Sequence, residues 1–507
     1  MRGTELPPRR PPPPDGSPLQ GRSLALVRAL SEQALSRAAG APLVPGNRLR
    51  LLRDATEGYP AWLAAIEGAR RSIHMESYIL AADAVGRRFA EALVAAVRRG
   101  VQVRILYDWL GDRGEAGRRF WRRLAAAGVE VRCFNPFRLD APLAWLRRNH
   151  RKSLVVDGRL AHVTGLCIAA RWAGAPERGV PPWRDTGVEL EGPAVADVAD
   201  AFAATWAEAG PPLPPEDAPG PEDLPPAGDV ALRVVATEPA TAGLYRLDQL
   251  VAALARRRLW ITDAYFVGVP SYVQALRAAA RDGVDVRLLV PGTSDLGIVK
   301  RLGVAGYRPL LAAGVRVFEW NGPMLHAKTA VADGLWARVG SSNLNVASWM
   351  GNWELDVAAE DAGFARTMED VFEEDLGNAT ELVLGAGRGL AAHAPPHPGA
   401  RRRKREGAAV AAAGVLRLGS AVGAALGGRR VLGPSDGSAL GWAGVVLLAA
   451  AIVTVLFPRA VLVPVIALQL WFGVTLLAQA IRMRRARRRA RSASRGGPPE
   501  SEPPRGD

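Results

Sequence analysis

Four short sequence blocks occur twice in this chain in the same order, and this internal repeat constrains the fold more than any other feature. The first copies span residues 73–78, 100–106, 126–131 and 150–158, and the second copies span residues 261–265, 283–289, 312–317 and 326–334. One such match could be accidental. Four matches in register indicate two halves of similar structure, and we expect these halves to face each other.

Each half alternates helical and strand-like patterns. In the first half, residues 59–70 and 87–99 have the pattern of helices, whereas residues 72–80 and 101–107 have the pattern of strands. This alternation favours the α/β class, with two α/β sandwich halves. Residues 210–228 contain eight prolines in a polar stretch, after which the pattern starts again. They therefore read as a linker between the halves.

Composition divides the whole chain into eight parts. The predicted parts are a disordered leader (1–22), a segment that could form a short helix (23–44), the first half (45–209), the Pro-rich linker (210–230), the second half (231–390), a basic linker (391–436), a transmembrane helical hairpin (437–482) and a basic disordered tail (483–507).

The hairpin is predicted from two apolar runs. Residues 439–457 and 460–481 are each about long enough to cross a bilayer as a helix. Arginines flank the pair on both sides, which predicts that both ends of the hairpin are cytoplasmic. Two buried core helices are the alternative. Residues 408–426 are too weakly apolar to span, and an interfacial position on the membrane surface would suit them.

The location of the positive charge points to a membrane partner. The net charge is +15, but residues 391–507 hold 18 Lys and Arg against 5 Asp and Glu, a net +13 that leaves only +2 for residues 1–390. A nucleic-acid enzyme is expected to carry positive charge over its working domain, so no nucleic-acid partner is expected. Basic runs beside apolar segments indicate contact with anionic lipid.

Two matching pairs of histidine and lysine carry the chemistry. Each His stands two residues before a Lys, and an Asp follows five residues after each Lys: His150, Lys152 and Asp157 in the first half, His326, Lys328 and Asp333 in the second. Side chains two apart on a strand share a face. If the halves meet pseudo-symmetrically, one pocket collects two imidazoles and two ammonium groups.

Such a pocket suits a phosphate diester. One imidazole can attack phosphorus while the other protonates the leaving alcohol. Lysines neutralise the non-bridging oxygens and the charge that builds in the transition state. Ser341 and Asn343 could offer further donors to a phosphate oxygen, and Asp185 or Glu354 could fix an imidazole tautomer. The alternative is a pair of histidines that are merely hydrogen-bonded within the fold.

The chain resembles the phospholipase D superfamily over residues 46–385, and more narrowly the bacterial cardiolipin synthases. The resemblance rests on the paired His-x-Lys-x4-Asp pattern and on the strings at 46–47, 76–79, 149–152, 183–186, 264–266 and 340–345. It implies two phospholipase D-like halves and a covalent phosphohistidine at either His150 or His326, and of the two we expect His150 to be the nucleophile and His326 the general acid. It implies no metal and no organic cofactor.

The same resemblance assigns the supporting groups. The phosphate would be bound by Lys152, Lys328 and Asn343. Asp185 and Glu354 would each orient the imidazole of the opposite half. Asp157 and Asp333 would support the motif without touching the reacting atoms.

One departure stands out, because Cys167 occupies the place of the family's first-half Asn. A thiol cannot donate as an amide does, which puts the first-half phosphate contact in doubt. The chain's only other cysteine is Cys133. The pair forms no disulfide framework and has no metal-site spacing.

The leading functional hypothesis is transfer of a phosphatidyl group to the hydroxyl of phosphatidylglycerol, which yields cardiolipin and glycerol. The site would work in the bacterial inner membrane, with the catalytic halves on the cytoplasmic side. A hydrolase of the same family is the first alternative, since water could accept the phosphatidyl group. A catalytically inactive membrane scaffold is the second, and Cys167 keeps it open. Lipid turnover separates the scaffold from the enzymes, and product identity separates the enzymes from each other.

Overall fold

The computed structural model describes residues 31–138, 147–214, 217, 224–384 and 390–393, together with nine single positions between 448 and 474. Residues 1–136 and 144–402 form one compact unit, and residues 137–143 and 403–507 form another. The single positions described in the second unit are helical. No helix within the described ranges has both the length and the apolar character that a membrane crossing requires. The predicted leader, hairpin and tail lie outside those ranges, apart from the single positions.

The first half of the unit formed by residues 1–136 and 144–402 is built, in its described part, from seven strands and the helices between them. Its elements are β1 (Val44–Arg53), α2 (Asp54–Gly68), β2 (Ser72–Ser77), α3 (Ala84–Arg98), β3 (Gln102–Asp108), α4 (Gly117–Ala126), β4 (Glu130–Phe134), β5 (Ser153–Val156), β6 (Leu160–Thr164), α5 (Ala170–Ala173), the 3₁₀-helix η2 (Pro176–Arg178), β7 (Thr186–Glu191) and α6 (Val195–Glu208).

The second half repeats this order and adds two strands. Its elements are β8 (Val230–Thr237), α7 (Gly243–Leu254), β9 (Arg258–Thr262), α8 (Pro270–Arg281), β10 (Asp285–Pro291), α9 (Gly297–Leu311), β11 (Arg316–Trp320), β12 (Thr329–Ala332), β13 (Trp336–Gly340), η5 (Ala347–Gly351), β14 (Glu354–Ala359), α10 (Ala362–Leu376), β15 (Ala379–Leu384) and β16 (Leu390–His393).

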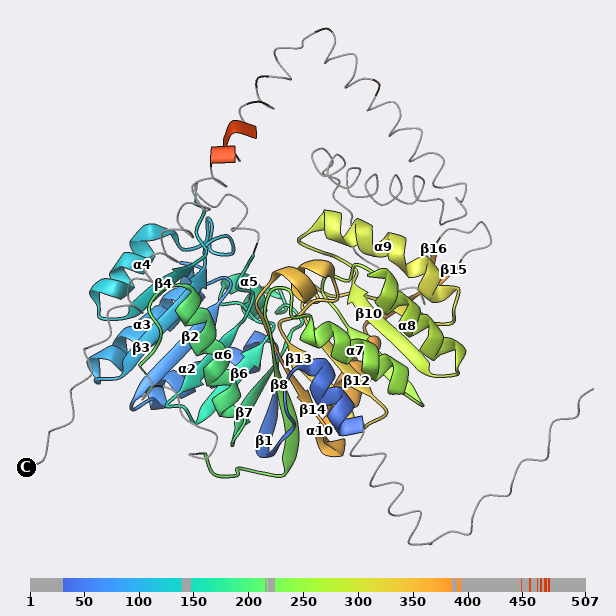
Figure 1. The fold of residues 1–507 in the computed structure, drawn as a ribbon, viewed down its shortest axis with the longest axis horizontal. Helices are drawn as coiled ribbons and strands as arrows, with labels where there is room; N and C mark the ends of the chain where they lie inside the picture. Colours follow the sequence, from blue (N-terminus) through green and yellow to red (C-terminus); the bar gives the residue numbers. More distant parts are fainter. Residues whose placement is uncertain are drawn as a thin grey trace, which may run out of the picture. The chain divides into compact units, whose positions relative to one another are not determined.

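The described strands join into one sheet whose order is symmetric about the antiparallel β1–β8 pair (Figure 1). Outward from β1 the order is β7-β6-β5-β2-β3-β4, and outward from β8 it is β14-β13-β12-β9-β10-β11, followed by β15 and β16. Every strand of the first half therefore has a counterpart in the second. The duplicated α/β architecture predicted from the repeat is the observed one.

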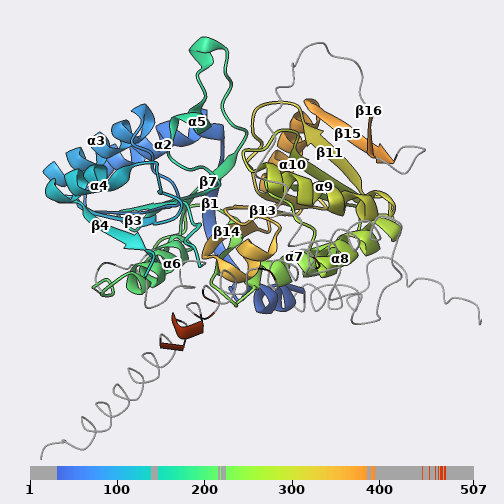
Figure 2. The same cartoon turned by 90° about the horizontal axis from the view of Figure 1, so that it is seen from above.

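Helices cover the sheet because each presents an apolar stripe. In α3 the buried residues Phe89, Leu93 and Ala96 recur at helical spacing, and the Asp83 side chain caps the first turn by accepting from Gly86 N at 3.0 Å. In Figure 2, α2, α3 and α4 lie on one face of the first half and α6 lies on the other. Full burial of a side chain such as Phe89 or Leu93 contributes about 1.5–3 kcal/mol.

The inner faces of the two halves share a hydrophobic core. Buried Val163 and Leu190 of the first half belong to the same cluster as Val339 and Leu355 of the second half. The halves are therefore packed as one body, and the edges that carry the catalytic motifs are fixed relative to each other.

Some local expectations need adjustment. The helix expected at residues 59–70 begins earlier, since α2 spans Asp54–Gly68. Within the segment 23–44, residues 31–39 are helical. The last described strand, β16, runs three residues past the expected end of the second half at residue 390. The two His-Lys pairs, expected on strands, lie in extended segments immediately before β5 and β12.

Candidate active site

The segments that carry the histidines cross from one half to the other. The His150 N–H donates to Trp353 O at 2.9 Å, and the Trp353 N–H donates to Arg148 O at 2.8 Å. On the other side, the His326 N–H donates to Arg184 O at 2.7 Å. Each His-containing segment therefore pairs with the segment of the opposite half that leads into a strand, β14 or β7.

This pairing brings each imidazole against a carboxylate of the other half. Nδ1 of His150 lies 2.9 Å from Oε2 of Glu354, and Nδ1 of His326 lies 2.7 Å from Oδ2 of Asp185. Both carboxylates are fully buried. An Nδ1–H that donates to a carboxylate leaves Nε2 unprotonated and able to act as a nucleophile or base.

The two lysines lie beside their own histidines. The Nζ of Lys152 donates to His150 O, and the Nζ of Lys328 donates to His326 O. The Lys328 ammonium also lies 2.9 Å from Nδ1 of His326. That nitrogen makes one strong hydrogen bond, and the carboxylate of Asp185 is the closer partner with the opposite charge. We therefore regard Lys328 as a cation beside this pair and not as the hydrogen-bond donor to the ring.

Burial favours the neutral form of both imidazoles. It lowers the pKa of His150, with Glu354 partly opposing this, and it lowers the pKa of His326 well below the ordinary value, with Lys328 and Lys152 acting in the same direction. Burial also lowers the pKa of Lys328 to about 8 and lowers the pKa of Lys152. The pocket therefore combines two imidazoles whose neutral form is favoured by burial with two lysines whose ammonium form is disfavoured by burial.

The two carboxylates have different environments. Burial raises the pKa of Asp185 to about 6, although Lys328 partly offsets this. Burial alone would also raise the pKa of Glu354, but His150, Lys152 and the hydrogen bond from Ser341 outweigh it and leave the pKa below its ordinary value. The Ser341 hydroxyl donates to Oε2 of Glu354 at 2.6 Å. The residue at this point of the first half is a glycine, so Asp185 receives no such hydroxyl.

That glycine, Gly165, is required by the close approach of the acid. A Cβ at Gly165 would lie 2.3 Å from Oδ1 of Asp185, far inside contact distance. The Thr186 N–H donates to the same oxygen at 2.8 Å. In the first half the backbone of Gly165 and Thr186 therefore packs directly against the Asp185 carboxylate. In the second half the Ser341 hydroxyl holds Glu354 instead.

Aromatic rings enclose the imidazoles. Tyr78 meets His150 edge-on with ring centroids 4.8 Å apart, and Tyr265 meets His326 edge-on at 5.8 Å. Trp172 and Trp183 also flank His326, at 5.5 Å and 6.0 Å. The sequence interpretation gave these rings no role. Two of them could have been found, because Tyr78 and Tyr265 occupy matching points of the repeat.

The predicted phosphate contacts are placed unequally. Because the Ser341 hydroxyl proton is used by Glu354, we regard Ser341 as a positioning residue. Asn343 is buried, and its Oδ1 has no hydrogen-bond partner in the described part of the chain. Since amide oxygen and nitrogen can exchange places by rotation, Asn343 is a polar group available to a ligand. Cys167, at the matching point, is a buried free thiol whose pKa is raised by burial.

The two motif aspartates lie away from the histidines, at the far ends of β5 and β12. Asp157 accepts from the backbone N–H groups of Arg70, Arg71 and Ser72, with its shortest bond at 2.7 Å. Asp333 accepts from residues 256–258 in the same way. Both have φ near +55°. They tie each catalytic strand to the start of its neighbour and contact no reacting group.

Within the described ranges, no group of three or more His, Cys, Asp or Glu side chains is arranged to hold a metal ion. The groups that do converge are two imidazoles, two ammonium groups and two carboxylates. This set can hold an anionic diester and perform nucleophilic and acid–base steps on it.

Comparison with known proteins agrees with this chemistry. A family model described as cardiolipin synthase, PLD-like domain, matches residues 62–171 and 251–376. Cardiolipin synthase A of Pseudomonas aeruginosa is 35% identical over 365 residues, covering 69% of this chain and 71% of that protein. Cardiolipin synthase 1 of Bacillus cereus is 30% identical over 381 residues, covering 72% of each.

A solved structure shares the fold. The crystal structure of phosphatidylserine synthase from Haemophilus influenzae superimposes with a TM-score of 0.56 at 13% identity, covering 69% of this chain and 91% of that one. At this identity the likeness concerns the fold alone. The two ranges that the family model matches each contain one of the paired histidines.

Proposed function

The chain belongs to the family of cardiolipin synthases with phospholipase D-like domains, and from that premise we propose that it transfers a phosphatidyl group between two phospholipids to make cardiolipin. The observation that carries the proposal is the pair of imidazoles, His150 and His326, each held by a carboxylate of the opposite half. Phosphatidylglycerol is the proposed donor and acceptor.

In the first step, Nε2 of His150 attacks the phosphorus of the donor lipid. The P–N bond forms and the P–O bond to the glycerol head group breaks. His326 enters this step as an imidazolium, which Asp185 and the bound diester anion stabilise, and its Nε2 proton goes to the departing oxygen. Lys152 and Lys328 neutralise the non-bridging oxygens as charge builds on them, and Asn343 donates to one of them. The family resemblance implies a phosphohistidine at one of the two histidines, and we assign His150 as the nucleophile; the reverse assignment exchanges the two roles.

In the second step, the roles of the bases are reversed. His326 takes the proton from the hydroxyl of an acceptor phosphatidylglycerol, whose oxygen forms the new P–O bond as the P–N bond breaks. The products are cardiolipin and glycerol, and both histidines return to their starting state. Glu354 and Asp185 stabilise whichever imidazole is positively charged at each step.

The membrane placement is part of the proposal. Residues 437–482 would cross the bilayer as a hairpin with both ends in the cytoplasm, as their arginine flanks favour. The catalytic halves would then work at the cytoplasmic side of a bacterial inner membrane, where the basic segments meet anionic lipid. This position would give the site direct access to phosphatidylglycerol in the bilayer.

The proposal is tested by lipid product analysis. Membranes with the wild-type chain, or with a His150→Ala His326→Ala variant, are incubated with labelled phosphatidylglycerol, and the lipids are separated. The proposal expects cardiolipin from the wild type alone. Phosphatidic acid as the sole product would favour a hydrolase. No product with any phospholipid pair would favour an inactive scaffold, and Cys167 would be the first residue to restore to Asn.

A further inference from the structure

Arg151 is a buried cation that the steps described above do not use. It stands between His150 and Lys152 in the chain, and its side chain is fully buried. Side chains alternate between the two faces of an extended segment. Arg151 therefore points away from the face that carries His150 and Lys152, and it shares the opposite face with Asn149 and Ser153.

The Arg151 guanidinium contacts backbone carbonyl groups of three elements. Its Nε donates to Glu354 O of β14 at 3.0 Å. One Nη donates to Ala201 O of α6 at 2.5 Å, and the other donates to Thr237 O at the end of β8 at 3.4 Å. Its Cζ also lies 5.2 Å from the centroid of the Trp353 ring. Three of these four contacts are with the second half, and two are with the segment that carries the acid of the first imidazole.

Within the described ranges, no carboxylate forms an ion pair with Arg151. The Glu76 carboxylate is buried behind the same segment, but it accepts hydrogen bonds from Asn149 at 3.1 Å, from Ser153 at 3.0 Å and from Thr205. A guanidinium stays protonated even when it is buried. Because carbonyl groups are neutral, the charge of Arg151 acts on its surroundings without a direct counter-ion.

The second half has a less polar surface behind its catalytic segment. The positions that match Asn149, Arg151 and Ser153 are all buried and hold Leu325, Ala327 and Thr329. The same fold is therefore built without a buried arginine at this point. A buried charge is also weak evidence for stability, because its desolvation opposes folding. A requirement of the site explains Arg151 better than a requirement of the fold does.

A buried guanidinium also lies beside the other pair of imidazole and acid, but it has counter-ions. Arg184 directly precedes Asp185 in the chain. Its Nε donates to Asp375 at 2.8 Å, and its Nη1 lies 3.1 Å from Oδ1 of Asp54. Beside the second imidazole one cation therefore meets two carboxylates, whereas beside the first imidazole Arg151 meets only neutral groups.

Charged groups act on the first pair from several elements. Burial lowers the pKa of Arg151, and this is partly opposed by the carboxylates of Glu76 in β2, Glu238 after β8 and Glu354 in β14. Because the interaction of two charges is reciprocal, the charge of Arg151 favours the ionised form of Glu354. It also opposes a positive charge on His150, as do the two site lysines. Tyr78 contacts the same imidazole edge-on.

We propose that Arg151 is a positioning residue for the pair formed by His150 and Glu354. Its forked hydrogen bonds fix the segment that carries Glu354. Its charge keeps the Glu354 carboxylate ionised and disfavours a second proton on His150. The Nδ1–H of a neutral His150 then donates to Glu354, and Nε2 is free to attack phosphorus. This inference rests on the proposed transfer reaction, in which His150 enters the first step as a neutral imidazole.

Two substitutions separate the charge of Arg151 from its hydrogen bonds. Arg151→Lys keeps the charge, but an ammonium group cannot reach the three carbonyls as a fork does. We expect its kcat to fall about tenfold with an unchanged pH dependence. Arg151→Met also removes the charge, so His150 and Glu354 protonate more readily. We expect its kcat/KM to decrease at low pH over a range about one pH unit higher than in the wild type.

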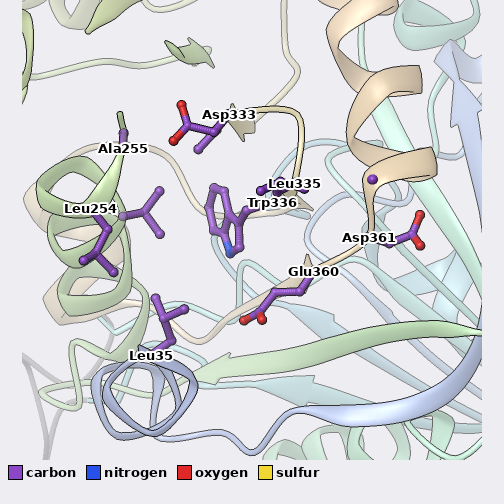
Figure 3. A pocket seen from close by; sticks show the side chains of 11 residues that line it. Leu35, Leu254, Ala255, Asp333, Leu335, Trp336, Glu360 and Asp361 are labelled. Atoms are coloured by element: carbon purple, nitrogen blue, oxygen red, sulfur yellow. The ribbon is translucent and has the colours of Figure 1, made fainter. Parts of the chain in front are cut away.

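Arg233 provides the matched control. Its side chain is equally buried, and it donates to Glu360, which directly follows β14. In Figure 3, Glu360 lies beside a groove lined by Leu35 and Trp336, at the end of β14 opposite to Glu354. We expect Arg233→Lys and Arg233→Met to lower the thermal unfolding temperature but to leave kcat per folded molecule and its pH dependence unchanged.

Rates of cardiolipin formation by the full chain decide between these roles. A wild-type kcat per folded molecule in Arg151→Lys would overturn the positioning role. A decrease of kcat/KM at low pH that coincides in Arg151→Met and the wild type would overturn the role of the charge. If Arg151→Met does not fold, the comparison of Arg151→Lys with Arg233→Lys decides.

A direct titration of His150 separates this inference from the proposed function. The full chain with ¹⁵N-labelled histidine is titrated in detergent micelles by NMR, and His150→Gln identifies the resonance. We expect the midpoint of His150 to lie about one pH unit higher in Arg151→Met than in the wild type or Arg233→Met. Equal midpoints would overturn the inference, whether or not lipid is transferred. A wild type that makes no cardiolipin would contradict the proposed function instead.

Discussion

His150 and Glu354 are 204 positions apart in the chain, yet Nδ1 of His150 lies 2.9 Å from Oε2 of Glu354. The same relationship joins His326 to Asp185 across 141 positions at 2.7 Å. Neither half therefore contains a complete site, because each imidazole is held by an acid of the other half. The proposed chemistry therefore requires the two halves to pack against each other.

The acids can be tested with isosteric changes. We expect Glu354→Gln and Asp185→Asn each to lower kcat by about 10²-fold, because an amide can hold the wrong imidazole tautomer and cannot stabilise an imidazolium. Initial rates of cardiolipin formation, with thermal unfolding as a check on folding, measure this. Glu177→Gln, at an exposed acid whose ion-pair partner is Arg178, is the control and should leave the rate unchanged. Wild-type rates in Glu354→Gln would remove the proposed role of that acid.

The decrease of activity at high pH should follow the deprotonation of the Lys328 ammonium group. Its pKa is lowered to about 8 by burial, so raising the pH through 8 removes its positive charge and weakens phosphate binding. We expect kcat/KM to fall above about pH 8, since this parameter follows the free enzyme. In Lys328→Arg the charge persists, and the fall should move to higher pH even if the maximum is lower. If kcat/KM of Lys328→Arg decreases over the same pH range as that of the wild type, another group controls this decrease.

The close packing of the backbone around Asp185 can be tested by adding a methyl group at Gly165. Gly165→Ala places a Cβ at 2.3 Å from the carboxylate oxygen, so Asp185 must move and lose its contact with His326. We expect a loss of activity of about 10²-fold, similar to that of Asp185→Asn. Gly68→Ala is the matched control, because nothing lies within 4 Å of its added Cβ. Full activity in Gly165→Ala would mean that the site tolerates a displaced acid.

Cys167 and Asn343 occupy matching points of the two halves but should differ in importance. We expect Asn343→Ala to reduce kcat by about 10²–10³-fold, because it removes a donor to the phosphate, and Cys167→Ala to change it by less than about threefold. Both rates are measured on phosphatidylglycerol. Cys167→Asn tests the other direction, since an added amide should maintain or raise activity. A large loss in Cys167→Ala would give the thiol a part that its chemistry does not suggest.

Asp157 should matter for stability and not for chemistry. Its carboxylate accepts from three backbone N–H groups at the far end of β5. We expect Asp157→Ala to lower the free energy of unfolding by about 1–3 kcal/mol while kcat per folded molecule stays the same. Denaturant unfolding and active-site titration separate the two effects. Asp370→Ala, on the exposed side of α10, serves as the control.

The features that depend on local residue spacing and on the internal repeat could be predicted from the sequence. His150, Lys152, His326 and Lys328 could be identified because a two-residue spacing on an extended segment gives one face, and because the motif occurs twice. The duplicated α/β fold followed from the same repeat. The idea that each acid serves the opposite half came from the family resemblance, and the catalytic roles of the acids stay predictions until the variants are measured.

Other features depend on contacts that no spacing reveals. The hydroxyl of Ser341 was assigned to phosphate, but the register of β13 against β14 points it at Glu354. Gly165 reads as an ordinary turn residue until the position of Asp185 shows what a Cβ would meet. Trp172 approaches His326 from 154 positions away, and this approach is set by the packing of the halves.

The covalent step is the central claim, and one measurement addresses it directly. Purified enzyme is mixed with phosphatidylglycerol labelled at phosphorus, quenched in alkali within one turnover, digested, and examined for a phosphorylated peptide. The account predicts label on the His150 peptide of the wild type, and none in His150→Ala His326→Ala. Cardiolipin formation in the wild type with no labelled histidine at any quench time would contradict it.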